Sequence, residues 1–200
     1  MLNHPDNTPF FEIPVVFGDN PEVRIRRYSP GDGNRALTVM KRVYIDELGW
    51  RHAFLREAVK ALRDMLLTHD PKRELFLLAE ADKKPVGVMF LKKKSERVSF
   101  LRWLTVTENV RNRSLGKKFL ECAVDFSRNA GYETMELVTV DRLERAREFY
   151  RRQGFVETAR KRDTVWEMSV ELCFFSRDLE RRLTLKTIKP EDTSPDIPSR

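Results

Sequence analysis

A basic segment marks the point where an apolar strand pattern gives way to a helix, between Leu104 and Gly116. Its sequence, LTVTENVRNRSLG, predicts a strand end, a polar linker and a helix that begins near Ser114. The first turn of a helix leaves backbone N–H groups without partners and carries partial positive charge, which suits pyrophosphate oxygens. Four basic side chains stand around it: Arg111, Arg113, Lys117 and Lys118. An ordinary basic helix start with a solvated face fits this segment equally.

A second chemical pattern lies in the short helix predicted over residues 143–153. Leu143, Ala146 and Tyr150 stand at i, i+3 and i+7, so they share one helix face. The small Ala146 leaves room for a ligand along that face, with the Tyr150 phenol at the far end. Gly154 ends the helix and Phe155 starts a strand. Taken alone, Tyr150 fits a core aromatic residue as well as a functional one.

These residues need a scaffold, and the hydrophobic pattern predicts one of alternating strands and helices. The helices are expected over 36–48, 52–67, 115–130 and 143–153. The strands are expected over 23–26, 74–80, 86–91, 97–106, 134–140, 155–156 and 165–173, with a turn at 82–85. This order, β-α-α-β-β-β-α-β-α-β-β, predicts an α/β domain with a mixed sheet of about seven strands and four helices.

The domain is expected over residues 23–175. The first 22 residues hold four prolines and little periodicity, so we interpret residues 1–22 as an extended arm. Residues 176–200 end in prolines among Asp, Thr and Ser and are predicted to form a polar tail. A chain of 200 residues is long enough for one domain with a real core.

Composition narrows the class of protein. No apolar run approaches the roughly 20 residues that span a bilayer, and the first residues lack a secretory pattern. Cys122 and Cys173 are too few for a disulfide framework, and three scattered histidines without a CxxC pair give no metal signature. We therefore expect a cytoplasmic protein without a metal.

The net charge of +7 points to anionic partners. However, 38 basic residues are interspersed among 31 acidic ones, a pattern typical of a solvated surface. A phosphate-bearing cofactor accounts for the local cluster, and no helix-turn-helix or RNA-binding signature is present. Neither a nucleic-acid nor a membrane partner is expected.

Two motifs together resemble the GNAT superfamily of N-acetyltransferases. The segment from Arg111 to Gly116, RNRSLG, resembles its Q/R-x-x-G-x-G/A acetyl-CoA loop, and the segment from Ala146 to Phe155 resembles its A-x-x-x-Y-x-x-x-G-F signature. The resemblance covers residues 22–174 and implies a mostly antiparallel GNAT-like sheet. Four further segments, LRWLTV, AGYETMELVTV, VWE and YIDELGW, are similar to acetyltransferase domains fused behind MarR-type regulators. No winged-helix half is expected within these 200 residues.

The resemblance implies a transfer of the acetyl group from acetyl-CoA to a primary amine by direct attack. Backbone groups of Leu104, Thr105 and Val106 would pair with the pantetheine arm. Tyr150 would protonate the departing thiolate, and a backbone N–H of the splayed strand would polarise the acyl carbonyl. The pyrophosphate would lie on the N–H groups of Arg111, Asn112, Arg113, Ser114, Leu115, Gly116 and Lys117, and Ala146 would line the cofactor.

The sequence departs from the family pattern at two positions. Ser114 stands where glycine is usual, so its Cβ would crowd the phosphates unless its hydroxyl donates to them. Leu143 replaces an asparagine that helps many members to hold the cofactor. These departures bear on the tightness of CoA binding more than on the fold.

The acceptor side is less defined. An alkylammonium has a pKa of about 10.4, so a base or a water chain must remove a proton before attack. Glu47 is the first candidate for this base or for an anchor of the amine, ahead of His52 and Glu108; for each, a solvated surface role is the competing interpretation. Three aromatic residues are candidates for the acceptor pocket or for the core: Tyr44, Trp50 and Phe54. A small amine, an amino acid, a peptide N-terminus and a protein lysine all remain open.

The alternative to an active enzyme is a catalytically silent GNAT-like module that senses CoA or binds a protein. Ser114 and Leu143 motivate this alternative, whereas the retained Tyr150 argues against it. Both a monomer and a homodimer are compatible with the sequence.

Overall fold

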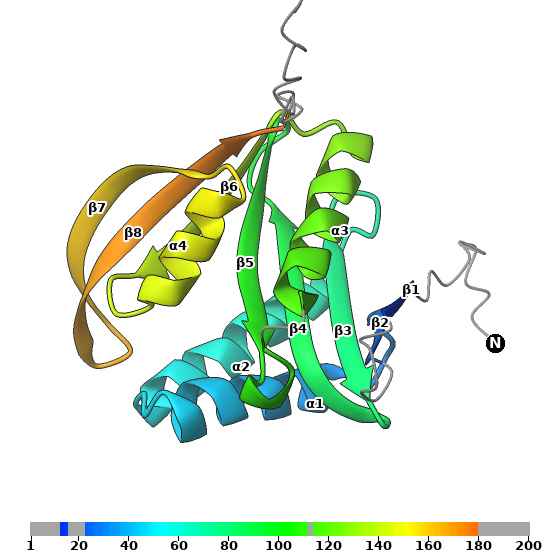
Figure 1. Cartoon of the computed structure of the whole chain (residues 1–200), viewed down its shortest axis with the longest axis horizontal. Helices are drawn as coiled ribbons and strands as arrows, with labels where there is room; N and C mark the ends of the chain where they lie inside the picture. Colours follow the sequence, from blue (N-terminus) through cyan, green and yellow to red (C-terminus); the bar gives the residue numbers. More distant parts are fainter. Residues whose placement is uncertain (1–12, 16–22, 112–113, 180–200) are drawn as a thin grey trace, which may run out of the picture.

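A computed structural model describes residues 13–15, 23–111 and 114–179. Within these residues, eight strands form one sheet in the order β1-β2-β3-β4-β5-β6-β8-β7 (Figure 1). The strands are β1 Ile13–Val15, β2 Val23–Arg27, β3 Leu75–Ala81, β4 Lys84–Lys93, β5 Val98–Val106, β6 Thr134–Val140, β7 Val156–Val165 and β8 Met168–Asp178. The helical segments are α1 Gly33–Met40, the π-helical η1 Lys41–Glu47, α2 His52–Leu67, the 3-10 turn η2 Glu108–Val110, α3 Leu115–Asn129 and α4 Glu144–Arg152.

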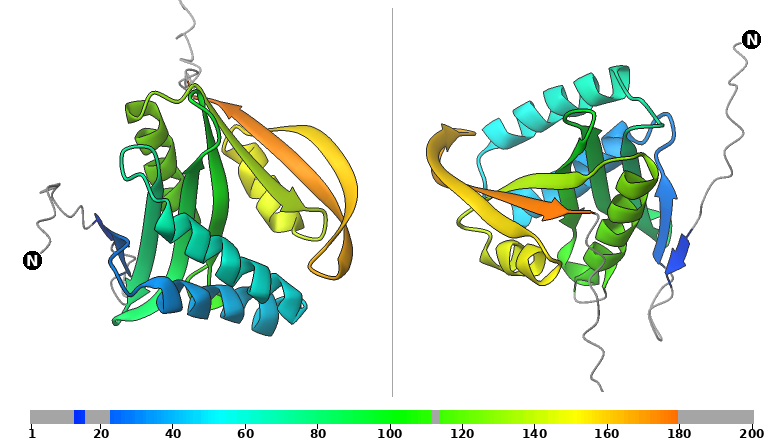
Figure 2. Two further views of the ribbon diagram at one scale, coloured as in Figure 1. Left: turned by 180° about the vertical axis from the view of Figure 1, so that it is seen from behind. Right: turned by 90° about the horizontal axis from the view of Figure 1, so that it is seen from above.

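Helices cover both faces of the sheet. Seen from above in Figure 2, α1 and α2 lie on one face and α3 and α4 on the other. A core cluster under α3 and α4 includes Leu101, Phe119 and Tyr150, and a second cluster under α1 and α2 includes Phe90 and Trp103. The sheet therefore separates two cores, and each functional side chain belongs to one face or the other.

The central strands explain why both faces are covered. The strand β3 is buried along almost its whole length, so its sequence is a continuous apolar run rather than an alternating pattern. At Gly87 of β4 an added Cβ would lie 2.9 Å from the Phe119 ring, so glycine is required there for α3 to approach the sheet. This close packing fixes the helix whose first turn carries the basic segment.

The sheet splits between β5 and β6. These two strands are the parallel pair, and their register runs only from Val98↔Thr134 to Leu101↔Leu137. Beyond that point β6 pairs with β8 alone and β5 with β4 alone, and Figure 1 shows β5 and β6 diverging. The split leaves the backbone edge of β5 after Leu101 facing an opening in the sheet.

The predicted architecture is confirmed: a mixed α/β domain with a mostly antiparallel sheet and four α-helices. Eight strands are present instead of about seven because β1, inside the segment interpreted as an arm, pairs with β2. The rest of that arm, residues 1–12 and 16–22, lies outside the described residues, as does the tail from residue 180. The strand β8 continues to Asp178, past the expected domain boundary at residue 175.

The last two strands differ from the prediction. They were expected over 155–156 and 165–173, whereas β7 spans Val156–Val165 and β8 starts at Met168. The strand β7 lies at the sheet edge and is exposed along most of its length, so its sequence VETARKRDTV lacks the apolar alternation that marks a half-buried strand. As a consequence, Val165 ends a strand instead of beginning one.

Candidate functional site

The N-terminus of α3 points its unpaired backbone N–H groups into the loop after β5. Ser114 is the N-cap residue; its φ is +59°, in the left-handed region, and its side chain makes no capping hydrogen bond. Only glycine adopts this conformation without strain, which gives a physical reason for the glycine expected there. The backbone at Ser114 therefore keeps the geometry of a glycine turn although the residue is serine.

Gly116 lies in the first turn of α3, close to β5 and α4. An added Cβ would meet only Leu104 Cδ2 at 3.6 Å and Phe149 Cζ at 4.0 Å, which is ordinary contact. Packing within the described chain does not demand glycine here. The missing side chain instead leaves the helix terminus accessible to a ligand.

The basic side chains of this loop do not all face outward. Arg111 folds back: its Nε donates to the Val106 carbonyl at 3.0 Å and its guanidinium forms an ion pair with Glu47. Lys117 and Lys118 are exposed and lie 3.9 and 2.9 Å from Glu121. Asn112 and Arg113, two of the predicted phosphate-binding residues, lie outside the described residues.

The end of β5 carries the backbone groups expected to hold the pantetheine arm. Leu104, Thr105 and Val106 pair with Met89, Val88 and Gly87 of β4, and their other edge faces the split. The Val106 carbonyl already accepts the Arg111 hydrogen bond, so an added strand at this position shares that carbonyl or displaces Arg111. Thr105 is buried, and its hydroxyl lies 3.3 Å from the Tyr44 hydroxyl.

Tyr150 lies near the C-terminal end of α4, buried in the core on the α3 and α4 face. Its ring packs against Phe149 and Phe155, with centroids 5.4 and 5.7 Å apart. Burial raises the pKa of Tyr150, and the Tyr44 hydroxyl raises it further. Its hydroxyl makes no hydrogen bond to any described residue, so the phenol is a neutral donor without a protein acceptor.

Tyr44 approaches the same place from the opposite face of the sheet. It lies in η1, where the wider π turn follows α1, and π turns often occur at functional sites. Burial raises the pKa of Tyr44, while the Thr105 hydrogen bond and the charge of Arg111 lower it in part. The Tyr44 phenol therefore lies beside Thr105 of β5 and raises the pKa of Tyr150 from the opposite face of the sheet.

Glu47 occupies the end of the same π-helical segment but is not a free carboxylate. Besides the Arg111 ion pair, it accepts a hydrogen bond from the Glu108 backbone N–H at 3.2 Å, and Arg42 Nε lies 3.9 Å away. This geometry makes Glu47 an anchor for the loop after β5. His52 and Glu108, the weaker candidates for the base, have exposed side chains.

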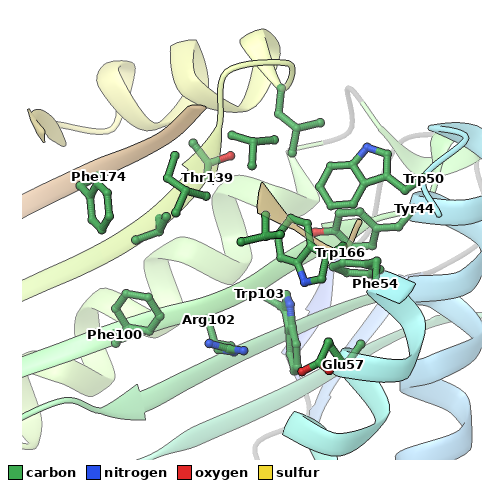
Figure 3. A pocket seen from close by; sticks show the side chains of 16 residues that line it. Tyr44, Trp50, Phe54, Glu57, Phe100, Arg102, Trp103, Thr139, Trp166 and Phe174 are labelled. Carbon is green, nitrogen blue, oxygen red and sulfur yellow. The ribbon is translucent and has the colours of Figure 1, made fainter. Parts of the chain in front are cut away.

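A pocket of about 310 Å³ opens on the α2 side of the split (Figure 3). Its walls come from η1, α2, both diverging strands and the β7–β8 hairpin. Much of the lining is aromatic: Tyr44, Trp50, Phe54, Phe100, Trp103, Trp166 and Phe174. The residues expected from the sequence, Tyr44, Trp50 and Phe54, are all among them. Leu143, expected on the cofactor side, also lines this pocket.

The β7–β8 hairpin closes one end of the pocket with its two-residue turn. Trp166 and Glu167 have φ values of +53° and +59°, which is the pattern of a type I′ turn. The indole of Trp166 stacks on Trp50 with centroids 5.1 Å apart, and Glu167 pairs with Arg56 of α2 at 2.7 Å. A tryptophan is strained at this position, so its indole is held in place by contacts rather than by local preference.

A family model places this architecture among known proteins. The model described as the acetyltransferase (GNAT) family matches residues 40–155, more than half of the 200 residues. The chain belongs to this GNAT acetyltransferase family. The matched range includes η1, the split strands, the N-terminus of α3 and Tyr150, whereas the β7–β8 hairpin with Trp166 lies beyond it.

Similar proteins agree on the fold. A probable N-acetyltransferase, camello, of Xenopus laevis is 27% identical over 115 residues, and this match spans 56% of the present chain and 52% of that relative. A solved putative GNAT acetyltransferase from Desulfovibrio desulfuricans has a TM-score of 0.65 at 18% identity, with 78% of this chain and 99% of that chain covered. One from Elizabethkingia anophelis, solved with acetyl-CoA bound, has a TM-score of 0.57 at 16% identity, with 80% and 99% covered.

The GNAT chain carries site residues that sequence reasoning missed. Arg102 and Trp103 line the pocket together although they are consecutive in a strand, and Trp166 reaches it from the hairpin turn. The sequence contains no signal for the first pair because a β-bulge depends on the partner strand. For Trp166, the last strand was expected to begin at residue 165, which placed the turn residues inside a strand.

Two features are absent from the described residues. No group of three His, Cys, Asp or Glu side chains comes together in them as a metal site requires. In the same part of the chain, no helix is both long and apolar enough to cross a membrane.

Proposed function

We propose that this GNAT chain transfers an acetyl group from acetyl-CoA to a primary amine by direct attack. The observation that carries the proposal is the Tyr150 phenol: burial keeps it protonated, and no described residue accepts its hydrogen bond. Tyr150 lies in the core on the α3 and α4 face, and the aromatic pocket opens on the other face of the sheet. A donor and an acceptor entering from opposite faces would meet beside Tyr150.

The reaction needs one bond made and one broken. The neutral amine nitrogen attacks the thioester carbonyl carbon, the C–N bond forms and the C–S bond breaks. Tyr150 gives its proton to the departing thiolate. The nitrogen that has become part of the amide loses a proton to solvent, and solvent returns a proton to the Tyr150 phenolate. A free thiol has a pKa of about 8.5, and a positioned proton donor contributes about 10²- to 10⁴-fold to the rate.

The donor side of the proposal uses the first turn of α3 for the pyrophosphate. Ser114, Leu115, Gly116 and Lys117 offer backbone N–H groups there, and the accessible backbone at Gly116 supports this role. The Arg111 N–H already donates to the Glu108 carbonyl at 3.1 Å, so Arg111 would act through its ion pair with Glu47, which fixes the loop. Asn112 and Arg113 complete the predicted set. Leu104, Thr105, Val106 and Ala146 would line the pantetheine arm.

The acceptor side assigns Glu47 to one of the two roles expected for it. Its ion pair with Arg111 and its hydrogen bond from Glu108 favour an anchoring role over that of a free base. Deprotonation of the amine would then proceed through water in the pocket, with Glu47 acting indirectly through the position of the loop.

A second function is favoured by one observation. Ser114 places a Cβ at a left-handed position beside the phosphate site, which supports a silent module that senses CoA or binds a protein. The buried Tyr150, whose raised pKa keeps the phenol protonated, supports an active enzyme instead.

The proposal includes a division of the chain into an arm (1–22), a catalytic domain (23–175) and a tail (176–200). It also includes a monomer or a homodimer as the functional state. Likeness to domains fused to MarR-type regulators is supported by the segments around Trp103, Thr134 and Trp166. A cytoplasmic location is supported by the two cysteines, Cys122 and Cys173, which are both free.

The deciding experiment is a calorimetric titration of acetyl-CoA into the wild type, Tyr150→Phe, Gly116→Trp and Gly116→Ala. Micromolar binding is expected for the wild type and Tyr150→Phe, because the phenol acts in chemistry rather than in binding. Gly116→Trp should abolish binding by filling the helix terminus, whereas Gly116→Ala adds only ordinary contacts and should retain most of it. Thermal unfolding of each variant checks its fold.

An assay of CoA release with a panel of amines follows. Turnover by the wild type and its loss in Tyr150→Phe would support the enzyme. Binding without turnover for any amine would favour the silent module. Absence of acetyl-CoA binding by the wild type would overturn both.

A further inference from the structure

The wall of the aromatic pocket contains a β-bulge at the point where the sheet splits. Phe90 of β4 pairs with Trp103, and the next residue, Leu91, pairs with Leu101, so Arg102 has no partner on β4. The pairing with β6 also ends at Leu101. Because the bulge inserts one residue, Arg102 and Trp103 both line the pocket instead of pointing to opposite faces.

The guanidinium of Arg102 is a cation without a counterion in this pocket. Its Cζ lies 5.1 Å from the centroid of the Trp103 ring, and Figure 3 shows it between Phe100 and Trp103. It forms no ion pair or hydrogen bond with any described residue. By contrast, Arg26 in the same sheet is paired with both Asp32 and Glu80. Partial burial beside the aromatic rings lowers the pKa of Arg102, although the residue as a whole is exposed.

A second hollow with a basic lining adjoins the aromatic pocket at Arg102. Phe100 and Arg102 also line this hollow, with Lys92, Lys93 and Lys94. Lys93 and Lys94 are paired with Glu96 and Glu136, whereas half-buried Lys92 has no ion pair within the described residues. Asp64 is the acidic residue in the lining of this hollow. The balance of charge at this end is positive.

At the other end, the pocket is apolar around Trp50, Phe54 and Trp166. Glu57 also belongs to the lining and is drawn beside Trp103 in Figure 3. Glu57 has an exposed side chain, and it makes no ion pair with any described residue. An amine substrate with an aromatic body would fill the ring-lined part of the pocket, since 310 Å³ is at the lower end of small-molecule sites. An anionic group on that substrate would meet Arg102.

We propose that the acceptor is an aromatic or similarly apolar amine that carries a carboxylate, and that Arg102 binds this carboxylate. The inference rests on the proposed function and specifies its substrate class. A guanidinium binds a carboxylate through two parallel hydrogen bonds, and Arg102 is exposed enough for a ligand to reach it. Arg102 is a specificity-determining residue here and takes no part in the chemical step.

Two matched pairs of amines test the class. Phenylalanine and phenethylamine differ only in a carboxylate next to the amine, and 4-(aminomethyl)benzoate and benzylamine differ only in a distant one. For the wild type, kcat/KM should be higher for at least one acid than for its parent amine, by about tenfold or more. Equal rates within both pairs would contradict the proposal.

Arg102→Gln is the informative variant, with Arg63→Gln as the control. Arg63 is an exposed arginine of α2 that lines neither hollow, so both variants lose the same charge. Arg102→Gln should raise KM and lower kcat/KM for the preferred acid by about 10- to 100-fold, and leave its parent amine within about threefold. Arg63→Gln should change neither. An equal loss for acid and parent amine would overturn the assignment.

A binding measurement separates this inference from the proposed function. Calorimetry with N-acetylphenylalanine, N-acetylphenethylamine and the acetylated second pair reports on the pocket without turnover. If no amine is acetylated but an acid product binds the wild type and not Arg102→Gln, the proposed function fails and the ligand class stands. If amines are acetylated and neither rates nor binding depend on Arg102 or the carboxylate, the ligand class fails alone. If neither turnover nor binding depends on the carboxylate and on Arg102, the proposed ligand class is overturned whatever the outcome for the proposed function.

Discussion

At the residue scale, the site contains two buried phenols that come from opposite faces of the sheet. Tyr44 comes from the α1 and α2 face and Tyr150 from the α3 and α4 face, and the Tyr44 hydroxyl lies 3.3 Å from that of Thr105 in β5. Burial favours the neutral form of both phenols, so each can act as a hydrogen-bond donor at physiological pH. The signature around Tyr150 was readable from the sequence, whereas the electrostatic effect of Tyr44 on Tyr150 was not, because it depends on how the two faces of the sheet are packed.

Tyr150→Phe should lower kcat by about 10²- to 10⁴-fold while the Kd for acetyl-CoA stays within about threefold. Because the pKa of Tyr150 is raised, the acid stays protonated below its ordinary pKa of about 10, and kcat should show no loss from its ionisation up to that pH. Tyr132→Phe is the control, since this buried tyrosine donates to the Arg73 carbonyl at 2.8 Å, away from the split. Full activity in Tyr150→Phe would exclude the proton-donor role.

Glu47 and Arg111 should act as one unit in binding acetyl-CoA. If Glu47 positions the loop through Arg111, Glu47→Gln and Arg111→Ala should each weaken acetyl-CoA binding, and the double variant should be little worse than Arg111→Ala. A double-mutant cycle by calorimetry should give a coupling of about 0.5–1 kcal/mol. If Glu47 were the base, kcat would fall in Glu47→Gln alone and additivity in binding would be observed.

At the element scale, the sequence predicts regular elements well and local distortions poorly. The helix α2 and the strand β6 have the expected bounds, His52–Leu67 and Thr134–Val140, since their apolar residues follow one period from end to end. The π turn of η1, the bulge at Arg102 and the left-handed Trp166 escaped prediction, because each depends on a partner element rather than on local preference. All three distortions border the pocket.

Ser114→Gly should stabilise the fold and leave the cofactor site open. A residue other than glycine in the left-handed region costs about 1–2 kcal/mol of stability. The conformational freedom that glycine adds to the unfolded chain offsets about 0.4–1 kcal/mol of the gain from removing that cost. Denaturant unfolding should therefore show a net gain of about 0.5–1 kcal/mol. Acetyl-CoA should bind as tightly or more tightly, because the Cβ beside the phosphates is removed.

Weaker acetyl-CoA binding in Ser114→Gly would show instead that the serine hydroxyl donates to the phosphate. Ser114→Ala separates these outcomes, since it keeps the Cβ and removes the hydroxyl. Equal binding by Ser114→Ala and the wild type would leave the backbone as the phosphate ligand.

At the scale of the whole molecule, the proposed function would use the split sheet to give two ligands separate routes to one point. The N-terminus of α3 would serve one face, and the aromatic pocket, closed by the β7–β8 hairpin through Glu167 and Arg56, would serve the other. The alternating order of elements was sufficient to predict the mixed sheet. The route of the acceptor was not predictable, because the hairpin returns across the opening from the far end of the chain.

Hydrogen exchange should reveal the two routes separately. Acetyl-CoA at about 100 times its Kd should slow exchange by about 10- to 100-fold in amides whose opening is incompatible with the bound ligand. We expect this protection in Leu104–Val106 and in the first turn of α3, with little change in the turn at Trp166. Adding N-acetylphenylalanine to the CoA complex should then protect the Trp166 turn and the start of α2. Protection of both regions by acetyl-CoA alone would mean that the cofactor occupies the aromatic pocket as well, and a separate acceptor route would have to be abandoned.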